Sequence, residues 1–277
     1  MTPRVTAHLQ SRPKGRIYHY SSQQGLLGIL ETREFWATKI QFMNDAEEFR
    51  HAIALAKAIL ERRQNELGRI DAIDCAIQHL PITETTDIFL ACFSEVGDLL
   101  SQWRGYCPEG IGFSIGFDYQ ELEAVAIAQE CFIGRCIYDM DTKNNLLEEI
   151  IDHFLGRASS QPVDSDGPIF QEFLMNFWVV APLLKDPSFQ EENEWRIISF
   201  PKSLKDALVG LRAGKSTLIP YFRLKLETMK KSALNEIEII VSPNPNMNLA
   251  LAGASALLTS KKLKGAVKAS SVPFRGW

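Results

Sequence analysis

The fold is decided by the stretch Asp87-Ile88-Phe89-Leu90-Ala91-Cys92-Phe93-Ser94, in which almost every residue is apolar. A strand with one wet face alternates apolar and polar residues, whereas a short continuous apolar run is typical of a strand covered on both faces. We therefore predict that this stretch is a central strand of a sheet.

Other strand and helix patterns surround this stretch without regular strand–helix–strand alternation. We predict strands at 17–20, 34–38, 110–118, 132–138, 194–200, 218–226, 237–241 and 266–272, and helices at 25–31, 45–64, 70–79, 99–106, 146–157, 169–184 and 246–262. This order favours the α+β class, with a mixed, mostly antiparallel sheet as the core and several flanking helices. We expect residues 1–16 to be a flexible N-terminal arm, and 17–277 to be a single domain with a helical insertion around 140–186.

The composition is that of a globular protein with a substantial core, since 45% of the 277 residues are hydrophobic and 23% are charged. Apolar stretches such as 177–184 are too short to cross a membrane, and the N-terminus lacks the apolar segment of a secretion signal. The five cysteines have no CxxC spacing, so we interpret them as reduced thiols in a cytoplasmic protein.

Charge is distributed unevenly along the chain. Residues 201–277 contain 13 Lys and Arg against 4 Asp and Glu, whereas residues 1–200 contain 17 against 30. A basic C-terminal third is typical of a surface that meets phosphate, so nucleic acid is one candidate partner. The alternative is that these lysines cover a solvated surface and pair with the acidic part of the same domain.

Two polar segments near the N-terminus are candidates for binding. Tyr18, His19 and Tyr20 end the first predicted strand, where a His or Tyr side chain can hydrogen-bond a ribose or an amide. Tyr18 and Tyr20 share one face of that strand and His19 lies opposite, as an ordinary edge strand would also arrange them. Asn44 and Asp45 are typical of a turn that caps the following helix.

A second group of candidates follows the central strand. Ser94 ends that strand, and Trp103, Arg104 and Tyr106 lie in the short helix after it. Segments that follow central strands often carry sites, and an arginine there can pair with phosphate while Trp or Tyr stacks on a base. The alternative is that Trp103 and Tyr106 fill core space.

The segment 190–197 reads Gln-Glu-Glu-Asn-Glu-Trp-Arg-Ile and places acidic residues at the start of an apolar strand. We expect Glu192 and Glu194 to point the same way, with Arg196 on that face and Trp195 in the core. Two neighbouring carboxylates repel each other, which raises a pKa and favours a general-base role or the binding of a sugar hydroxyl or cationic intermediate. The alternative is that Glu194 pairs with an arginine as part of the fold.

Several enzyme classes lack their usual sequence signatures. The chain has no GxGxxG after a strand, no GxxxxGK[ST], no HExxH and no GxSxG. Its five histidines are scattered without metal-ligand spacing, so we expect no metal.

An ordered set of short segments runs through the chain, namely Tyr18-His19-Tyr20, Phe35-Trp36-Ala37-Thr38, Phe42-Met43-Asn44-Asp45, Cys92-Phe93-Ser94-Glu95, Trp103-Arg104-Gly105-Tyr106, Gly110-Ile111-Gly112-Phe113, Phe117-Asp118, Glu192-Asn193-Glu194-Trp195-Arg196 and Ser271-Val272-Pro273-Phe274-Arg275. From about residue 17 to 275 this set resembles the bacterial family called domain of unknown function 2971, whose name assigns no activity.

Two features also resemble ADP-ribosyltransferases of the DNA-modifying toxin type: a first strand with Tyr-His followed at once by a helix, and a late strand opened by Glu-x-Glu. The resemblance implies an ADP-ribosyltransferase-like arrangement with NAD as co-substrate. Glu194 would then be the catalytic carboxylate and Glu192 its helper, while His19 or Tyr20 would contact the ribose or nicotinamide. Arg104 or the basic C-terminal third would meet the pyrophosphate. The full set of candidate NAD-binding residues is Tyr18, His19, Tyr20, Asn44, Asp45, Ser94, Trp103, Arg104, Tyr106 and Arg196.

Three functions therefore compete. The first is an NAD-dependent ADP-ribosyltransferase or NAD glycohydrolase, of the kind used as a toxin or phage-defence effector, with nucleic acid or a protein as its target. The second is a protein that binds or processes nucleic acid without NAD chemistry. The third is a non-catalytic interaction module, for which we expect Glu192 and Glu194 to be buried and paired with no cleft beside them. Convergence of Tyr20, Asn44, Arg104 and Glu194 on one cleft would favour the first, whereas scattering of these residues would contradict it.

Overall fold

The computed structural model describes residues 1–43, 46–107 and 111–273. Its central element is β3 (Phe89–Ser94), which lies in the middle of a ten-stranded sheet, so the prediction made from the apolar run is confirmed. One edge of β3 pairs with β6 (Glu194–Ser199) along its whole length. The other edge is shared by β1 (Ile17–Ser21) and β2 (Glu34–Lys39).

The sheet extends outward from this centre in both directions. Its order is β10-β9-β4-β1-β3-β2-β8-β7, and β6 joins β3 to β5. The outer strands are β4 (Phe113–Phe117), β5 (Cys131–Arg135), β7 (Val209–Ala213), β8 (Leu218–Lys225), β9 (Ile237–Val241) and β10 (Gly265–Ala269). The pair β9–β10 is parallel and the other registered pairs are antiparallel, as the α+β prediction expects.

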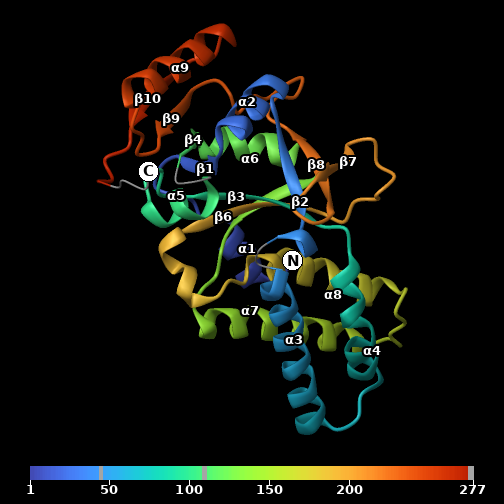
Figure 1. Ribbon diagram of the computed structural model, residues 1–277. Coiled ribbons are helices and arrows are strands. Elements are labelled where there is room, and N and C mark those ends of the chain that lie inside the picture. Colours follow the sequence, from blue (N-terminus) through green and yellow to red (C-terminus); the bar gives the residue numbers. More distant parts are fainter. Residues whose placement is uncertain (44–45, 108–110, 274–277) are drawn as a thin grey trace.

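Helices cover both faces of the sheet (Figure 1). Alternation along β3 and β6 sends Leu90 and Ile198 into one core, and Phe93 and Trp195 into the other. The first core lies under α3 (Ala46–Leu67), α4 (Asp71–His79), α7 (Met140–Ala158) and α8 (Pro168–Val180). The second lies under α2 (Gln23–Thr32), α6 (Tyr119–Ile127) and α9 (Met247–Ser260). The expected position of Trp195 in the core is therefore confirmed, since its side chain is fully buried.

The helical layer beside the first core is assembled from two distant parts of the sequence. α7 and α8 fall where a helical insertion is expected around 140–186, and both pack with α3 and α4, which precede β3. The layer is therefore held together by apolar contacts between segments on either side of the central strand.

Three elements differ from the sequence-based expectation. Pro3–Leu9 form α1, whose Val5 is buried, so this part of the expected flexible arm is a helix packed on the domain. The second element is α6, which begins at Asp118, whose carboxylate accepts hydrogen bonds from two backbone N–H groups. The third is β7, a short edge strand whose residues are half-buried or exposed, which weakens the apolar pattern that identifies a strand.

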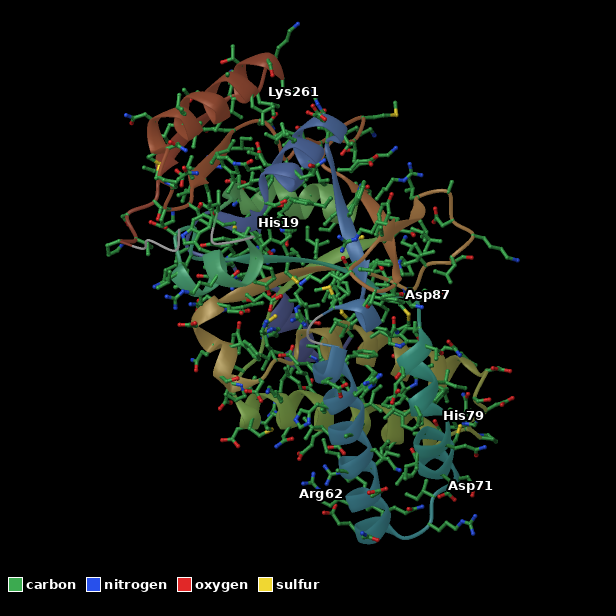
Figure 2. The ribbon with its side chains drawn as sticks, viewed as in Figure 1. His19, Arg62, Asp71, His79, Asp87 and Lys261 are labelled. Carbon is green, nitrogen blue, oxygen red and sulfur yellow. The ribbon has the colours of Figure 1, made fainter. Side chains whose placement is uncertain are left out.

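The described residues hold no helix long and apolar enough to cross a membrane. All five cysteines are free. Over the same residues no group of three or more His, Cys, Asp and Glu side chains is arranged to hold a metal ion. Figure 2 shows His79 in the helical layer, far from His19.

Candidate functional site

A cleft opens in the sheet where β1 and β2 separate. β1 pairs with β3 at Ser94 and β2 pairs with it at Phe89 and Leu90, and the two strands diverge between these points. Between them lies a cavity of about 580 Å³, which also reaches α2, α5 and β7. A cavity of this size is typical of a site for a small molecule or cofactor.

His19 lies at the point where the two strands part. Its Nδ1 lies 2.9 Å from the carbonyl oxygen of Cys92 on β3. A carbonyl oxygen can only accept a hydrogen bond, so Nδ1 of His19 carries the proton. This N–H donates to Cys92 O in the place of a backbone N–H from a neighbouring strand. Burial lowers the pKa of His19, so the ring is neutral near pH 7 and Nε2 is a hydrogen-bond acceptor.

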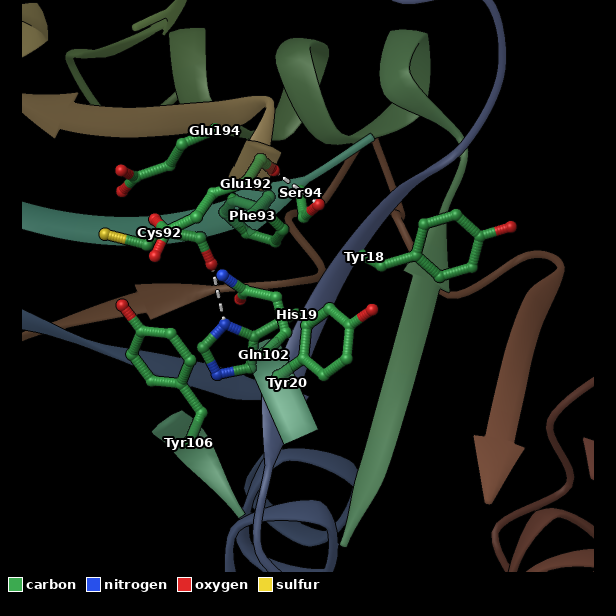
Figure 3. A pocket seen from close by; sticks show the side chains of 10 residues that line it. All are labelled: Tyr18, His19, Tyr20, Cys92, Phe93, Ser94, Gln102, Tyr106, Glu192 and Glu194. Atoms are coloured by element: carbon green, nitrogen blue, oxygen red, sulfur yellow. Dashed lines mark hydrogen bonds between the residues drawn. The ribbon is translucent and has the colours of Figure 1, made fainter. Parts of the chain in front are cut away.

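A smaller recess of about 40 Å³ adjoins the cleft, and His19, Cys92 and Tyr106 line both spaces. Glu192 and Glu194 also line the recess. Figure 3 shows the hydroxyl of Tyr106 turned toward the side where Cys92 and Glu194 lie and Nδ1 of His19 facing the carbonyl oxygen of Cys92, whereas the ring of Tyr18 turns away. Its volume accommodates a few water molecules or a ligand hydroxyl, so a larger group has to lie in the main cleft.

Glu194 is the most strongly held carboxylate beside the recess. Arg196 donates to both of its oxygens, from Nε to Oε1 at 2.8 Å and from Nη2 to Oε2 at 3.1 Å. Lys185 Nζ donates to Oε2 at 2.5 Å. All three side chains are almost completely buried, so these ion pairs form in a region of low dielectric constant.

These contacts determine the charge of Glu194. Burial alone would raise its pKa, but the charges and hydrogen bonds of Arg196 and Lys185 outweigh burial and lower the pKa from 4.5 to about 2. The expectation that repulsion between two carboxylates raises a pKa is therefore wrong for Glu194. The reason is that the cations Lys185 and Arg196 approach more closely than the sequence shows, and they hold Glu194 ionised.

Glu192 meets Glu194 through a shared lysine and not through strand alternation. It ends the short 3-10 helix η5 (Pro187–Glu192), and Asn193 follows in the left-handed region with φ of 43°. Its Oε2 accepts from Lys185 Nζ at 2.7 Å. The prediction that Glu192 and Glu194 lie on one face of a strand is corrected in this respect, although both carboxylates line the recess.

Two alternatives were expected for Glu192 and Glu194, a functional site and a buried, ion-paired cluster without a cleft, and the structure agrees with each in part. The two side chains are buried or nearly so and are ion-paired, as a packing role requires. They also border a cavity, which a purely structural cluster does not need. The cluster is therefore both part of the fold and accessible from the cleft.

Seven predicted site residues line the recess together, namely Tyr18, His19, Tyr20, Ser94, Tyr106, Glu192 and Glu194. Three of them already have protein partners for their hydroxyl groups. Tyr18 donates to Glu238 and packs on Gly116, where a Cβ would lie 2.5 Å from its ring. Tyr20 donates to Val96 O at 2.6 Å, and Ser94 donates to Glu192 O at 2.6 Å. These three residues shape the recess, which leaves His19, Tyr106, Glu192 and Glu194 as the chemically useful group.

Three further predicted residues, Trp103, Arg104 and Arg196, do not line the recess. Trp103 is fully buried and packs edge-on against Tyr20, so its packing interpretation holds. Arg104 is exposed on α5 (Leu100–Tyr106), outside the residues that line the two spaces. Arg196 lies beneath Glu194 and positions it. Asn44 and Asp45 lie outside the described residues.

Two residues that the sequence interpretation did not select border these spaces. Gln102 is buried and lines the recess, and Arg212 lines the main cleft. Gln102 is four residues before Tyr106 on α5, so helical spacing from Tyr106 would have found it. Arg212 lies on β7, which the sequence pattern did not reveal.

The basic C-terminal third is partly neutralised by the rest of the chain. Lys202 pairs with Glu130 and Lys261 with Glu31, whereas Lys268 pairs with Glu238 within the same third. These pairs support the interpretation that many of its lysines cover the surface of the same domain. Arg212 is the residue of this third that faces the cleft.

The C-terminal segment is tied to the helix that carries Gln102 and Tyr106. Asp98 accepts hydrogen bonds from Trp103 Nε1 at 2.9 Å, Ser270 Oγ at 2.5 Å, and Ser271 N and Oγ at 2.6 and 2.8 Å. Burial raises the pKa of Asp98, but these donors outweigh burial and lower it, so the carboxylate is ionised at neutral pH. Asp98 therefore joins the start of α5 to residues 270–271.

Replacing Asp98 with alanine is expected to lower the free energy of unfolding by about 1–3 kcal/mol, because several donors lose a charged acceptor. Urea denaturation of the two proteins measures this difference. Ser271→Ala removes only part of the same set and is expected to cost less. A change below about 0.5 kcal/mol for Asp98→Ala would show that water replaces the carboxylate without loss.

Comparison with known proteins gives one match. A family model described as "Protein of unknown function (DUF2971)" matches residues 102–197, from α5 to β6. This part of the chain includes Gln102, Tyr106, Glu192 and Glu194. A search of curated proteins and a search of solved structures each found no match.

Proposed function

We propose that this protein binds NAD in the cleft between β1 and β2 and cleaves the bond between nicotinamide and ribose, as an ADP-ribosyltransferase or NAD glycohydrolase. The observation that carries the proposal is the position of Glu194, an ionised carboxylate in the wall of a recess that opens into a cleft of about 580 Å³. The cleft offers room for much of a dinucleotide, and the recess offers room for a ribose hydroxyl.

The reaction develops positive charge on the ribose. The bond between C1′ and the nicotinamide nitrogen breaks, its electron pair leaves with nicotinamide, and water or another nucleophile attacks C1′. A fixed carboxylate stabilises this cationic transition state more than the ground state, because the charge grows as the bond breaks. Glu194 supports such a role, since Lys185 and Arg196 keep it ionised and hold it in one orientation.

His19 supplies a second fixed group. Its Nδ1 is occupied by Cys92 O, so its Nε2 is available on the ring as an acceptor for a ribose hydroxyl or for the carboxamide N–H of nicotinamide. Because the ring is neutral, it does not repel the positively charged nicotinamide ring of NAD. His19 and Glu194 border the same recess, so both can contact the nicotinamide-ribose part of one ligand.

The direct test is incubation of the protein with NAD, followed by chromatography for free nicotinamide and ADP-ribose. We expect nicotinamide to be released. Free ADP-ribose identifies a glycohydrolase, and ADP-ribose attached to added DNA or to protein in a lysate identifies a transferase. Absence of nicotinamide release would exclude the proposed reaction, and absence of calorimetrically detectable NAD binding would also exclude the proposed NAD site.

Two His19 variants separate structure from chemistry. In His19→Asn the amide nitrogen takes the place of Nδ1 as donor to Cys92 O, but Nε2 is lost; in His19→Gln the amide lies nearer the position of Nε2. We expect His19→Asn to keep the fold and to lose at least tenfold in nicotinamide release, the loss of one positioned hydrogen bond. Unchanged release by both variants would remove His19 from the proposed site.

A further inference from the structure

Arg212 is a cation in the wall of the main cleft. Its Nη2 donates to Thr38 Oγ1 at 3.0 Å, a neutral acceptor. Its Nε is buried and has no hydrogen-bond partner among the residues that the structure describes. Within the described part of the chain it forms no ion pair, although its side chain is half-buried. A buried donor left without an acceptor destabilises the folded protein, so an anionic ligand there would supply the acceptor that the described residues do not.

Arg223 also has a buried Nε that has no hydrogen-bond partner among the described residues, but it does not line the cavity. Several other half-buried or buried arginines form ion pairs. Arg33 pairs with Glu227, Arg63 with Asp152, and Arg196 with Glu194. Arg212 differs from them in facing a cavity of about 580 Å³ instead of a carboxylate. The flat guanidinium group has donors spaced for two oxygens of a phosphate, which makes phosphate the anion that this position suits best.

Trp36 lies on the same face of the sheet as Arg212. Alternation along β2 places Trp36 and Thr38 on one face, and the paired register carries that face across β8 to Arg212. The Trp36 ring is stacked on Tyr221, with ring centres 4.4 Å apart and planes inclined by 22°. Tyr221 lies in turn over Gly210, where a Cβ would come within 2.9 Å of its ring. Tyr221 and Gly210 therefore support the indole ring from behind.

The supported ring is accessible to a ligand. Trp36 is 48% exposed and lines the same cavity as Arg212 and Thr38. A flat, rigid aromatic ring binds a nucleobase by stacking, because every base has a flat π-face. Trp36 and Thr38 are about 7 Å apart along the strand, and Arg212 reaches Thr38. This spacing is similar to that between the base and the phosphate of one nucleotide.

We propose that Trp36 and Arg212 form a nucleotide subsite, in which a nucleobase stacks on Trp36 and its phosphate binds Arg212. The inference rests on the proposed function only for the identity of the ligand as NAD, whose adenosine diphosphate half would lie here. The nicotinamide-ribose half would then extend past His19 toward Glu194. Arg212 belongs to the basic C-terminal third and takes the pyrophosphate role that the resemblance also assigned to Arg104.

Titration calorimetry with ADP and with adenosine tests the subsite without requiring catalysis. We expect the wild-type protein to bind ADP, and Arg212→Gln to weaken ADP binding at least tenfold, as for the loss of a charge-assisted hydrogen bond. Adenosine lacks phosphate, so its affinity should be the same for both proteins. Trp36→Leu should weaken both ligands.

Arg223→Gln is the matched control, because Arg223 lies on the same hairpin and donates to Ala207 O without lining the cleft. It removes the same charge and should leave ADP affinity unchanged. Equal losses of ADP affinity in Arg212→Gln and Arg223→Gln would show that any loss of positive charge on this hairpin weakens ADP binding, and would overturn the subsite. Failure of the wild-type protein to bind ADP at millimolar concentration would also overturn it.

The outcomes distinguish this inference from the proposed reaction. ADP binding that depends on Arg212, combined with no release of nicotinamide from NAD, supports the subsite and rejects the NAD chemistry. Release of nicotinamide with an unchanged KM in Arg212→Gln, combined with unchanged ADP affinity, rejects the subsite and keeps the chemistry.

Discussion

Replacing Glu194 with glutamine is expected to lower the rate of nicotinamide release from NAD by about 10²–10³-fold, the usual effect of removing one electrostatic group that stabilises a transition state. Glutamine has nearly the same shape as glutamate, but it carries no charge to stabilise the cationic ribose. The loss should therefore fall on kcat, while KM changes little. Single-turnover measurement of nicotinamide release with saturating NAD gives the rate of the chemical step.

The control for this variant is Glu48→Gln. Glu48 Oε2 lies 3.4 Å from Arg196 Nη2, so it belongs to the same ion cluster, but it does not line the recess. Both variants remove one negative charge beside Arg196, and both are expected to destabilise the fold. Only Glu194→Gln should lose two to three orders of magnitude in rate at a temperature where both proteins are folded. Equal rates in the two variants would assign Glu194 to the fold alone.

Replacing Lys185 with methionine is expected to lower the free energy of unfolding by about 3–5 kcal/mol, because it leaves buried carboxylates without a cation that they share. Lys185 is 1% exposed and holds Glu192 and Glu194 at 2.7 and 2.5 Å. Burial alone would lower the pKa of Lys185, but the charge of Glu194 outweighs burial and raises it, so the amine is charged in the folded protein. Methionine is similar in length, so the effect reports the lost charge more than a cavity.

Lys57→Met is the matched control for this experiment. Lys57 forms an exposed pair with Glu61 at 3.8 Å, and its loss should change the free energy of unfolding by less than about 1 kcal/mol. Urea denaturation of the three proteins gives both differences. A cost for Lys185→Met as small as that for Lys57→Met would mean that solvent enters the cluster.

The same cluster predicts how stability depends on pH. The pKa of Glu194 is 4.5 in the unfolded chain and about 2 in the folded protein, so the unfolded chain binds more protons between these values. The contribution of Glu194 to stability is therefore fully present above pH 4.5 and is lost as the pH falls toward 2. In Lys185→Met the folded pKa rises toward 4.5, and this part of the acid destabilisation becomes smaller.

The members of the candidate site could be predicted from the sequence to different extents. A position at the end of a strand identifies five members from the sequence, namely Tyr18, His19, Tyr20, Ser94 and Glu194. The pairing of β1, β3 and β6 brings them together. Trp103 was selected with them, but it is core, because one turn of helix presents Gln102 and Tyr106 to the recess and Trp103 to Tyr20. Trp36 belonged to the ordered segments and was not selected for binding, since nothing local shows that Tyr221 supports its ring.

The sequence by itself determined the central strand, the α+β class and the burial of Trp195. The reason is that a run of apolar side chains avoids contact with water, so its pattern indicates burial without knowledge of its neighbours in space. Only the tertiary structure decided that a cleft exists, since it depends on β1 and β2 sharing one edge of β3 and parting around Cys92. It also decided the charge of Glu194, which is set by Lys185 and Arg196 approaching within hydrogen-bond distance in a buried place. The physical reason is the distance in sequence over which each property is set. The side-chain pattern of a segment indicates whether that segment is buried, whereas electrostatic contacts and strand pairing depend on residues that the fold brings from elsewhere in the chain.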